Sequence, residues 1–70
     1  MSLDPNYWRQ QTAGFLARAE ECLRKAENTV LGPQAAEAWR QSALLYVRLA
    51  ERTKRMADIV ESIDTIKELD

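Results

Sequence analysis

Apolar and small residues recur along residues 5–29 in alternating steps of four and three, which is the spacing of one side of an α-helix. The stripe consists of Trp8, Thr12, Phe15, Ala19, Cys22 and Ala26, and it is widened by Leu16, Leu23 and Val30. Charged residues fill the opposite side, where Glu20 precedes Arg24 by four positions in the order that favours helix ion pairs. Asp4 followed by Pro5 supplies a cap and a preset first turn. The pattern therefore predicts an amphipathic helix over about residues 5–29.

A second stripe with the same spacing follows the pair Gly32-Pro33. Glycine tolerates positive φ and proline suits the first turn of a helix, so residues 30–33 are predicted to form a tight turn. The second stripe contains Ala36, Trp39, Ala43, Tyr46, Ala50, Thr53 and Ala57, and it is broadened by Val47, Leu49, Met56, Ile59, Val60, Ile63, Ile66 and Leu69. No glycine or proline occurs after Pro33, so a second helix is predicted over about residues 33–68.

The two predicted helices share part of their sequence, because Trp8-Arg9-Gln10 returns as Trp39-Arg40-Gln41. Two helices of one plan joined by a tight turn indicate an all-α antiparallel hairpin, and residues 1–70 are predicted to form a single domain. The predicted core comprises Trp8, Phe15, Cys22, Trp39, Tyr46 and Ala50. Gly14 falls inside the first helix, and the sequence leaves open whether it admits a neighbouring helix or is a tolerated surface position.

The second helix is longer than the first, at roughly 55 Å against roughly 36 Å for a rise of about 1.5 Å per residue. We therefore expect the first helix to end opposite Met56 and to leave the apolar tail of the second without an intrachain partner. Exposed apolar surface is unfavourable by about 25 cal/mol per Å². The predicted interface consists of Met56, Ile59, Val60, Ile63, Ile66 and Leu69. We expect a second copy to cover it, giving a homodimeric four-helix bundle or coiled coil; the alternative is a break between Ser62 and Thr65 that folds a third helix back.

Composition limits the chemistry that the chain can perform. One cysteine and no histidine exclude an internal disulfide and the commonest zinc sites, and the usual general base near neutral pH is missing. The net charge of −1 predicts no general attraction to nucleic acid or anionic membrane. No apolar run approaches the roughly 20 residues of a membrane span, and the N-terminus does not resemble a signal peptide. We expect a cytoplasmic protein that is no enzyme and binds no metal or cofactor.

Three groups of side chains have a functional interpretation beside a structural one. Cys22 is in register with the apolar stripe, which favours a core position over a reactive thiol. Trp8 and Trp39 are interpreted as hydrophobic anchors, with stacking on a base or ligand as the alternative. Arg48, Arg52 and Arg55 share a helical face and form a possible anion-binding site, although a solvated or partner-facing surface has the same spacing. In antiparallel copies these arginines would pass the acidic tail of the partner.

The chain resembles a group of short helical proteins frequent in alphaproteobacteria. These open with a Pro-x-x-Trp-Arg helix and carry a Tyr-x-x-Leu-Ala-Glu-Arg core in a second helix. The corresponding segments here are Pro5-Asn6-Tyr7-Trp8-Arg9 and Tyr46-Val47-Arg48-Leu49-Ala50-Glu51-Arg52. The linker at Gly32-Pro33 and the isoleucine-rich tail depart from that pattern. The resemblance implies a two-helix fold and no established activity.

These observations predict a small helical interaction or adaptor module that self-associates through its second helix. An unidentified protein partner is a further possibility. The alternative is a nucleic-acid-associated regulator that contacts phosphates through Arg48, Arg52 and Arg55 of a dimer. Phosphate contacts make binding strongly dependent on salt, which separates the two interpretations.

Overall fold

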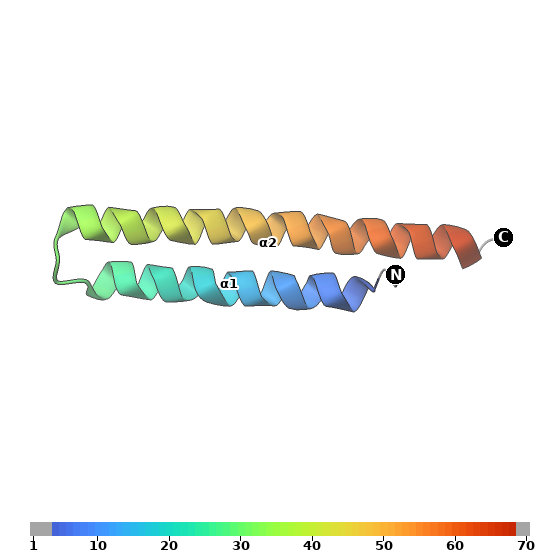
Figure 1. The fold of residues 1–70 in the computed structure, drawn as a ribbon, viewed down its shortest axis with the longest axis horizontal. Helices are drawn as coiled ribbons and strands as arrows, with labels where there is room; N and C mark the ends of the chain where they lie inside the picture. The colour runs from blue at the N-terminus through green and yellow to red at the C-terminus, as the bar shows by residue number, and fades with distance from the viewer. Residues whose placement is uncertain (1–3, 69–70) are drawn as a thin grey trace.

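The computed structural model describes residues 4–68, which form two α-helices packed side by side and antiparallel (Figure 1). Helix α1 spans Pro5–Asn28 and helix α2 spans Pro33–Glu68. The molecule is a rod of 59 × 17 × 13 Å. The predicted all-α hairpin is confirmed, and both helices begin and end within one residue of the predicted positions. Leu69 lies outside the described residues.

Helix α1 begins where the sequence supplies its cap. The Asp4 side chain accepts a hydrogen bond from the Asn6 backbone amide at 2.9 Å. Pro5 occupies the first turn, where its missing amide proton leaves no donor unsatisfied. The cap satisfies one of the free amides at the helix start, so the position of this end is encoded locally.

The turn between the helices depends on Gly32, whose φ of +103° is a conformation that other residues rarely adopt. Before it, Thr29 is extended and its hydroxyl accepts from the Leu31 amide at 3.2 Å. After it, the Gly32 carbonyl accepts from the Ala36 amide at 3.2 Å, within the first turn of α2. The chain thus reverses direction between Asn28 and Pro33.

Small side chains, rather than aromatic ones, fill the seam between the helices. The buried residues are Ala19, Cys22, Ala26, Ala36, Ala43, Ala50, Thr53, Ala57 and Val60. The prediction of a core position is confirmed for Cys22 and Ala50. It is wrong for Trp8, Phe15, Trp39 and Tyr46, which are half-buried and flank the seam. Two helices bury only a narrow strip, so a large ring extends past its edge, while alanines allow close approach of the backbones.

The register of the hairpin is marked by Thr12 and Thr53, whose hydroxyl oxygens lie 2.6 Å apart across the seam. The N-terminal end of α1 was expected to lie opposite Met56. In this register α1 covers α2 beyond that residue. Val60 is only 2% exposed, so its predicted place in an intersubunit interface is wrong. The underlying expectation placed the end of α1 about one turn too early.

Helix α2 continues without a break through Glu68, so the alternative of a third helix folding back is wrong. Within the tail, the Thr65 hydroxyl donates to the Glu61 carbonyl at 3.0 Å, as expected inside a continuous helix. Residues 62–67 are all exposed. The last turns of α2 therefore project beyond the start of α1 (Figure 1).

Candidate interaction surface

Helix α2 carries a second apolar stripe beside the one that packs on α1. The α2 stripe consists of Leu45, Leu49, Arg52, Met56, Ile59, Ile63 and Ile66, which alternate in steps of four and three. Leu49 and Met56 each precede a buried alanine by one residue, so the stripe is rotated by about 100° from the seam. Steps of four and three are the spacing of a helix that packs along another helix.

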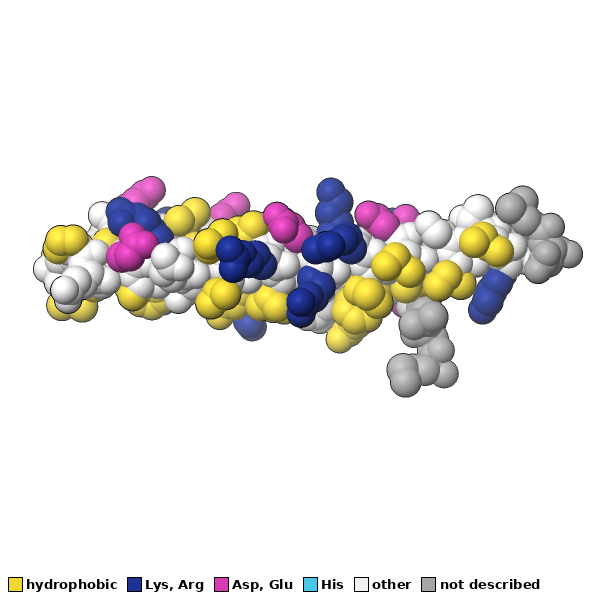
Figure 2. All heavy atoms as spheres, turned by 90° about the horizontal axis from the view of Figure 1, so that it is seen from above, with side chains coloured by type: hydrophobic (Ala, Val, Ile, Leu, Met, Phe, Trp, Pro, Cys, Tyr) yellow, Lys and Arg dark blue, Asp and Glu magenta, His cyan; other side chains and the backbone are white. Residues whose placement is uncertain are grey.

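The α2 stripe is exposed along its length. Leu45 is 58%, Ile59 52% and Ile66 62% exposed, Leu49 and Ile63 are 37% and 38% exposed, and Met56 is half-buried. In Figure 2, which looks onto α2, hydrophobic side chains gather along one edge of the rod and continue toward the C-terminal end. The stripe is a large apolar strip with no covering element in residues 4–68.

The structure places the predicted interface residues in different environments. Ile59, Ile63 and Ile66 are exposed and belong to the α2 stripe. Met56 is half-buried at its edge, Val60 is in the seam, and Leu69 lies outside the described residues. Sequence reasoning missed Leu45 and Leu49, although their spacing continues the same series. The signal was the unbroken alternation of four and three from residue 45 to residue 66.

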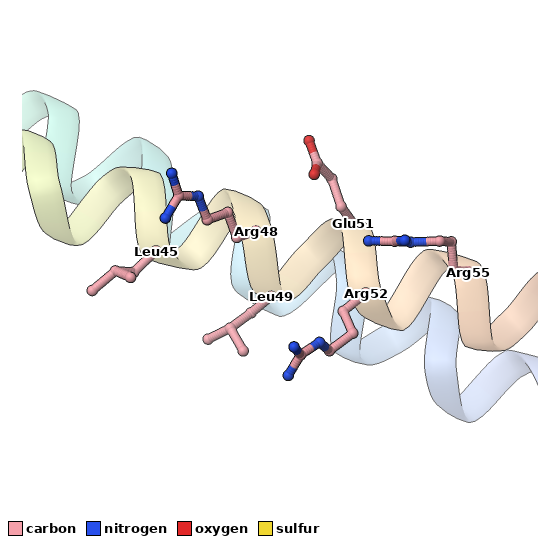
Figure 3. A pocket seen from close by; sticks show the side chains of 6 residues that line it. All are labelled: Leu45, Arg48, Leu49, Glu51, Arg52 and Arg55. Atoms are coloured by element: carbon pink, nitrogen blue, oxygen red, sulfur yellow. The ribbon is translucent and has the colours of Figure 1, made fainter.

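The three arginines of the predicted anion-binding site line one shallow groove, together with Leu45, Leu49 and Glu51 (Figure 3). Arg52 projects on the same side of α2 as the leucines, whereas Arg48 and Arg55 project on the other side. The guanidinium groups therefore do not converge on a common point. The Glu51 carboxylate also lines the groove, which reduces its attraction for an anion.

The surroundings of the cysteine and the two tryptophans show how each side chain packs in the hairpin. The thiol of Cys22 is buried in the seam, with 7% of the residue exposed. Lys25 places its ammonium nitrogen 4.7 Å from the ring centroid of Trp39, within the range of a cation–π contact. Trp8 packs edge-on against Tyr7 with their ring centroids 5.1 Å apart. Trp39 packs against the buried cluster of Ala19, Cys22 and Ala43, in agreement with the structural interpretation, whereas Trp8 is half-buried beside the exposed Tyr7.

A second apolar patch lies on the other side of the hairpin. This leucine face consists of Leu16 and Leu23 of α1 and Leu44 of α2, each close to 45% exposed, with the half-buried Val47 between the helices. Leu16 and Leu23 were assigned to the intrachain stripe on sequence grounds. They lie at its edge, because the seam accommodates only small side chains.

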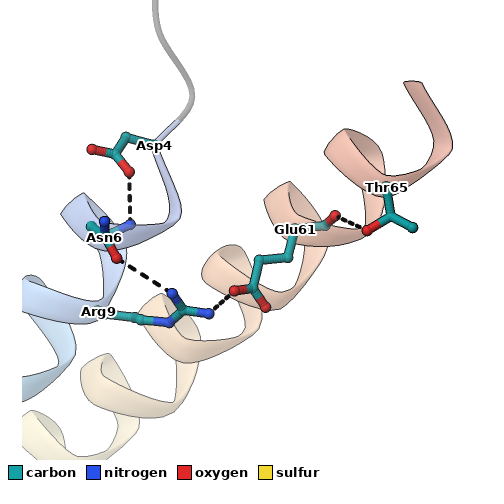
Figure 4. A network of polar contacts seen from close by, with 5 residues as sticks. All are labelled: Asp4, Asn6, Arg9, Glu61 and Thr65. Carbon is teal, nitrogen blue, oxygen red and sulfur yellow. Dashed lines mark hydrogen bonds and ion pairs between the residues drawn. The ribbon is translucent and has the colours of Figure 1, made fainter. Parts of the chain in front are cut away.

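Polar contacts close the open end of the hairpin. Arg9 forms an ion pair with Glu61 across the helices and donates to the Asn6 side-chain oxygen at 3.4 Å (Figure 4). Both partners of the ion pair are about half exposed, so its contribution to stability is about 0–1 kcal/mol. The pair therefore adds little stability, but it shows that Arg9 of α1 and Glu61 of α2 lie on the same side of the hairpin.

Comparisons and chemistry add no further assignment. Within residues 4–68, no group of three or more Asp, Glu, Cys or His side chains is arranged to hold a metal ion. Neither α1 nor α2 combines the length and apolar character needed to cross a membrane. No protein-family model matches the chain, and no curated protein or solved structure is significantly similar to it. The resemblance to alphaproteobacterial helical proteins stays a prediction.

Proposed function

We propose that the chain is a non-enzymatic helical interaction module that self-associates through the α2 stripe. The observation that carries this proposal is the exposed series from Leu45 to Ile66. Its spacing suits packing along another helix, and it lies on a rigid element whose other side is already occupied by α1. A second copy of the chain is always available as a partner, so no other molecule is needed to cover the stripe.

The energetics support association in preference to solvent exposure. A two-helix chain of 70 residues has one narrow seam, so its stability from burial is small. Covering half-exposed leucine and isoleucine side chains contributes about 25 cal/mol for each Å² of apolar surface removed from water. Self-association would therefore stabilise the hairpin as well as bury the stripe.

The test is the absolute mass in solution over a wide concentration range, by light scattering or sedimentation equilibrium. We expect the wild type to be larger than a monomer, with dissociation on dilution. The variant Ile59→Gln/Ile63→Gln removes apolar stripe surface while keeping good helix formers, and it should be monomeric at concentrations where the wild type is not. Val30→Gln/Leu31→Gln is the matched control, because these turn residues are 94% and 81% exposed and lie away from the stripe. A monomeric wild type at every concentration would overturn the proposal.

The nucleic-acid alternative has less support from the arrangement of its arginines. Arg52 points away from Arg48 and Arg55, and Glu51 lies among them. Mixed DNA and RNA at low salt provide the direct check, because phosphate contacts of this kind weaken steeply as salt rises. Salt-sensitive binding that is lost in Arg48→Gln/Arg55→Gln would favour this alternative.

A further inference from the structure

We infer that the α2 stripe of one copy docks on the leucine face of the next copy, and not on a second α2 stripe. This inference rests on the proposed self-association and specifies which surfaces meet. It is carried by the position of the two apolar surfaces on opposite sides of the hairpin and by the opposite charges around them.

The ion pair between Arg9 and Glu61 marks one side of the hairpin. Leu16 and Leu23 follow Arg9 at intervals of seven residues, so they lie on that side. Val47 precedes Glu61 by two such intervals and lies there too.

The stripe lies on the other side by the same geometry. Leu49 is two residues beyond Val47, which is a rotation of about 200° around α2. Arg18 is likewise two residues beyond Leu16 and covers the Tyr46 ring, with its guanidinium carbon 6.0 Å from the ring centroid. The hairpin therefore has a stripe side and a leucine side, which point in nearly opposite directions.

Basic residues surround the stripe. Arg52 belongs to it, and Arg18 of α1 adjoins its inner edge. Arg48 and Arg55 lie beyond its outer edge, where they project away from Leu45 and Leu49 and toward the side of Glu51 (Figure 3). Lys25 lies seven residues after Arg18 and therefore on the same side, where Glu21 pairs with it at 3.5 Å. The stripe thus presents an apolar strip in a cationic frame.

Acidic residues predominate around the leucine face. Glu20 and Glu27 of α1 and Glu51 and Asp58 of α2 flank it, each at a seven-residue interval from its neighbour in the same helix. Of these, Glu51 also lines the groove of the three arginines. The cations on this side are Arg9, which pairs with Glu61, Arg40, which approaches Glu37 at 3.6 Å, and Lys54. In Figure 2 most of the Asp and Glu side chains in view lie along the edge of α2 opposite the one where hydrophobic side chains gather. The leucine face is thus an apolar patch in an anionic frame.

These charges discriminate between the two ways of joining identical chains. Two stripes packed on each other would bring the basic residues around one stripe against those around the other, which is repulsive. The acidic tail does not offset this repulsion as expected from the sequence, because Asp58 and Glu61 lie on the leucine side of the hairpin. A stripe packed on a leucine face brings basic edges against acidic edges. Such an interface is heterologous, since each partner contributes a different surface, and it leaves one stripe and one leucine face free to bind further copies.

Complementation between two one-sided variants tests the inference. Ile59→Gln/Ile63→Gln weakens the stripe, and Leu16→Gln/Leu23→Gln weakens the leucine face; both use exposed positions and a helix-favouring residue, and circular dichroism checks that each keeps its helicity. For a heterologous interface each variant alone should associate roughly tenfold or more weaker than wild type. An equimolar mixture should form a dimer that stops at two copies, because one intact stripe meets one intact leucine face. Sedimentation equilibrium of each variant and of the mixture gives all three results.

The effect of salt on self-association provides an independent test of the inference. Opposite charges across the interface make association weaken as NaCl rises from about 0.05 to 0.5 M, whereas like charges would make it strengthen. If the wild type associates while Leu16→Gln/Leu23→Gln retains wild-type affinity and the mixture gains nothing, the inference is overturned and the proposed self-association survives. If the wild type is a monomer throughout, both are overturned.

Discussion

The hydroxyl oxygens of Thr12 and Thr53 lie 2.6 Å apart across the seam, forming a side-chain hydrogen bond between the two helices. Each hydroxyl also lies within bonding distance of a carbonyl in its own helix, Thr12 with Trp8 at 2.9 Å and Thr53 with Ala50 at 3.0 Å. A hydroxyl has one proton, so at any time one threonine donates to the other while the second donates to its own carbonyl. The pair is a polar marker of register in a seam otherwise lined by small residues.

Replacing one member of this pair should cost more than replacing both. We expect Thr53→Val to lower the free energy of unfolding by about 1 kcal/mol, because the Thr12 hydroxyl loses its partner across the seam. The double variant Thr12→Val/Thr53→Val should recover part of that loss, since no hydroxyl then remains in the pair. Urea denaturation of the four chains at one protein concentration measures the coupling. Strictly additive losses would show that the two hydroxyls act independently.

The limits of the helices could be predicted because they are encoded locally. The Asp4 cap and the Gly32 turn each act within a few residues, so their signals are readable without the tertiary structure. The core could not be predicted as well. Trp39 and Tyr46 fit the apolar spacing as well as the alanines do, and spacing alone does not distinguish the centre of a stripe from its edge. In a hairpin only the centre is buried, and alanine occupies it.

The extent of the exposed surface was missed for a related reason. Leu49 adjoins the buried position Ala50, so it is expected to widen the intrachain stripe, and only residues from Met56 onward were assigned to an interface. The structure shows that Leu49 belongs to a second, exposed stripe that starts at Leu45, because α1 covers only one narrow side of α2. Val60 was misassigned in the opposite direction, since the reach of α1 along α2 depends on the tertiary register and not on length alone.

The small-residue seam predicts opposite effects for two neighbouring substitutions. Ala50 is 2% exposed between the helices, so Ala50→Leu should destabilise the hairpin by about 2 kcal/mol through overpacking. Leu49 is 37% exposed on the α2 stripe, so Leu49→Ala should change the stability of the monomeric hairpin by less than about 1 kcal/mol while weakening association. Thermal denaturation at low concentration, followed by circular dichroism, compares the two. A neutral Ala50→Leu would contradict close packing at this point.

The two glycines should respond oppositely to alanine. A Cβ added at Gly14 meets no atom within 4 Å, and its backbone is helical, so Gly14→Ala should stabilise the hairpin by about 1 kcal/mol. Gly32 has φ of +103°, which strains any other residue, so Gly32→Ala should destabilise by about 1 kcal/mol or more. The melting temperatures of both variants measured beside wild type decide the matter. Destabilisation by Gly14→Ala would indicate that another chain approaches α1 closely at this position.

Two truncations should separate folding from association. A chain ending at Glu61 keeps Val60 in the seam and the Arg9 ion pair, but it loses Ile63 and Ile66 from the α2 stripe. A chain ending at Ala57 loses Val60 and Glu61 as well. We expect the chain ending at Glu61 to keep the monomer stability of the full chain. Its self-association should be weaker by roughly tenfold or more, because two exposed isoleucines are gone.

The chain ending at Ala57 should in addition have a melting temperature several degrees lower, because it lacks the fully buried Val60 of a small seam. Both peptides need amidated C-termini, so that a new carboxylate does not act on the negative end of the helix dipole. Thermal denaturation at low concentration and sedimentation at high concentration give the two readouts. Equal melting temperatures for the two truncations would contradict the role of Val60 in the hairpin. If the chain ending at Glu61 self-associates with unchanged affinity, the end of α2 is not part of the assembly surface.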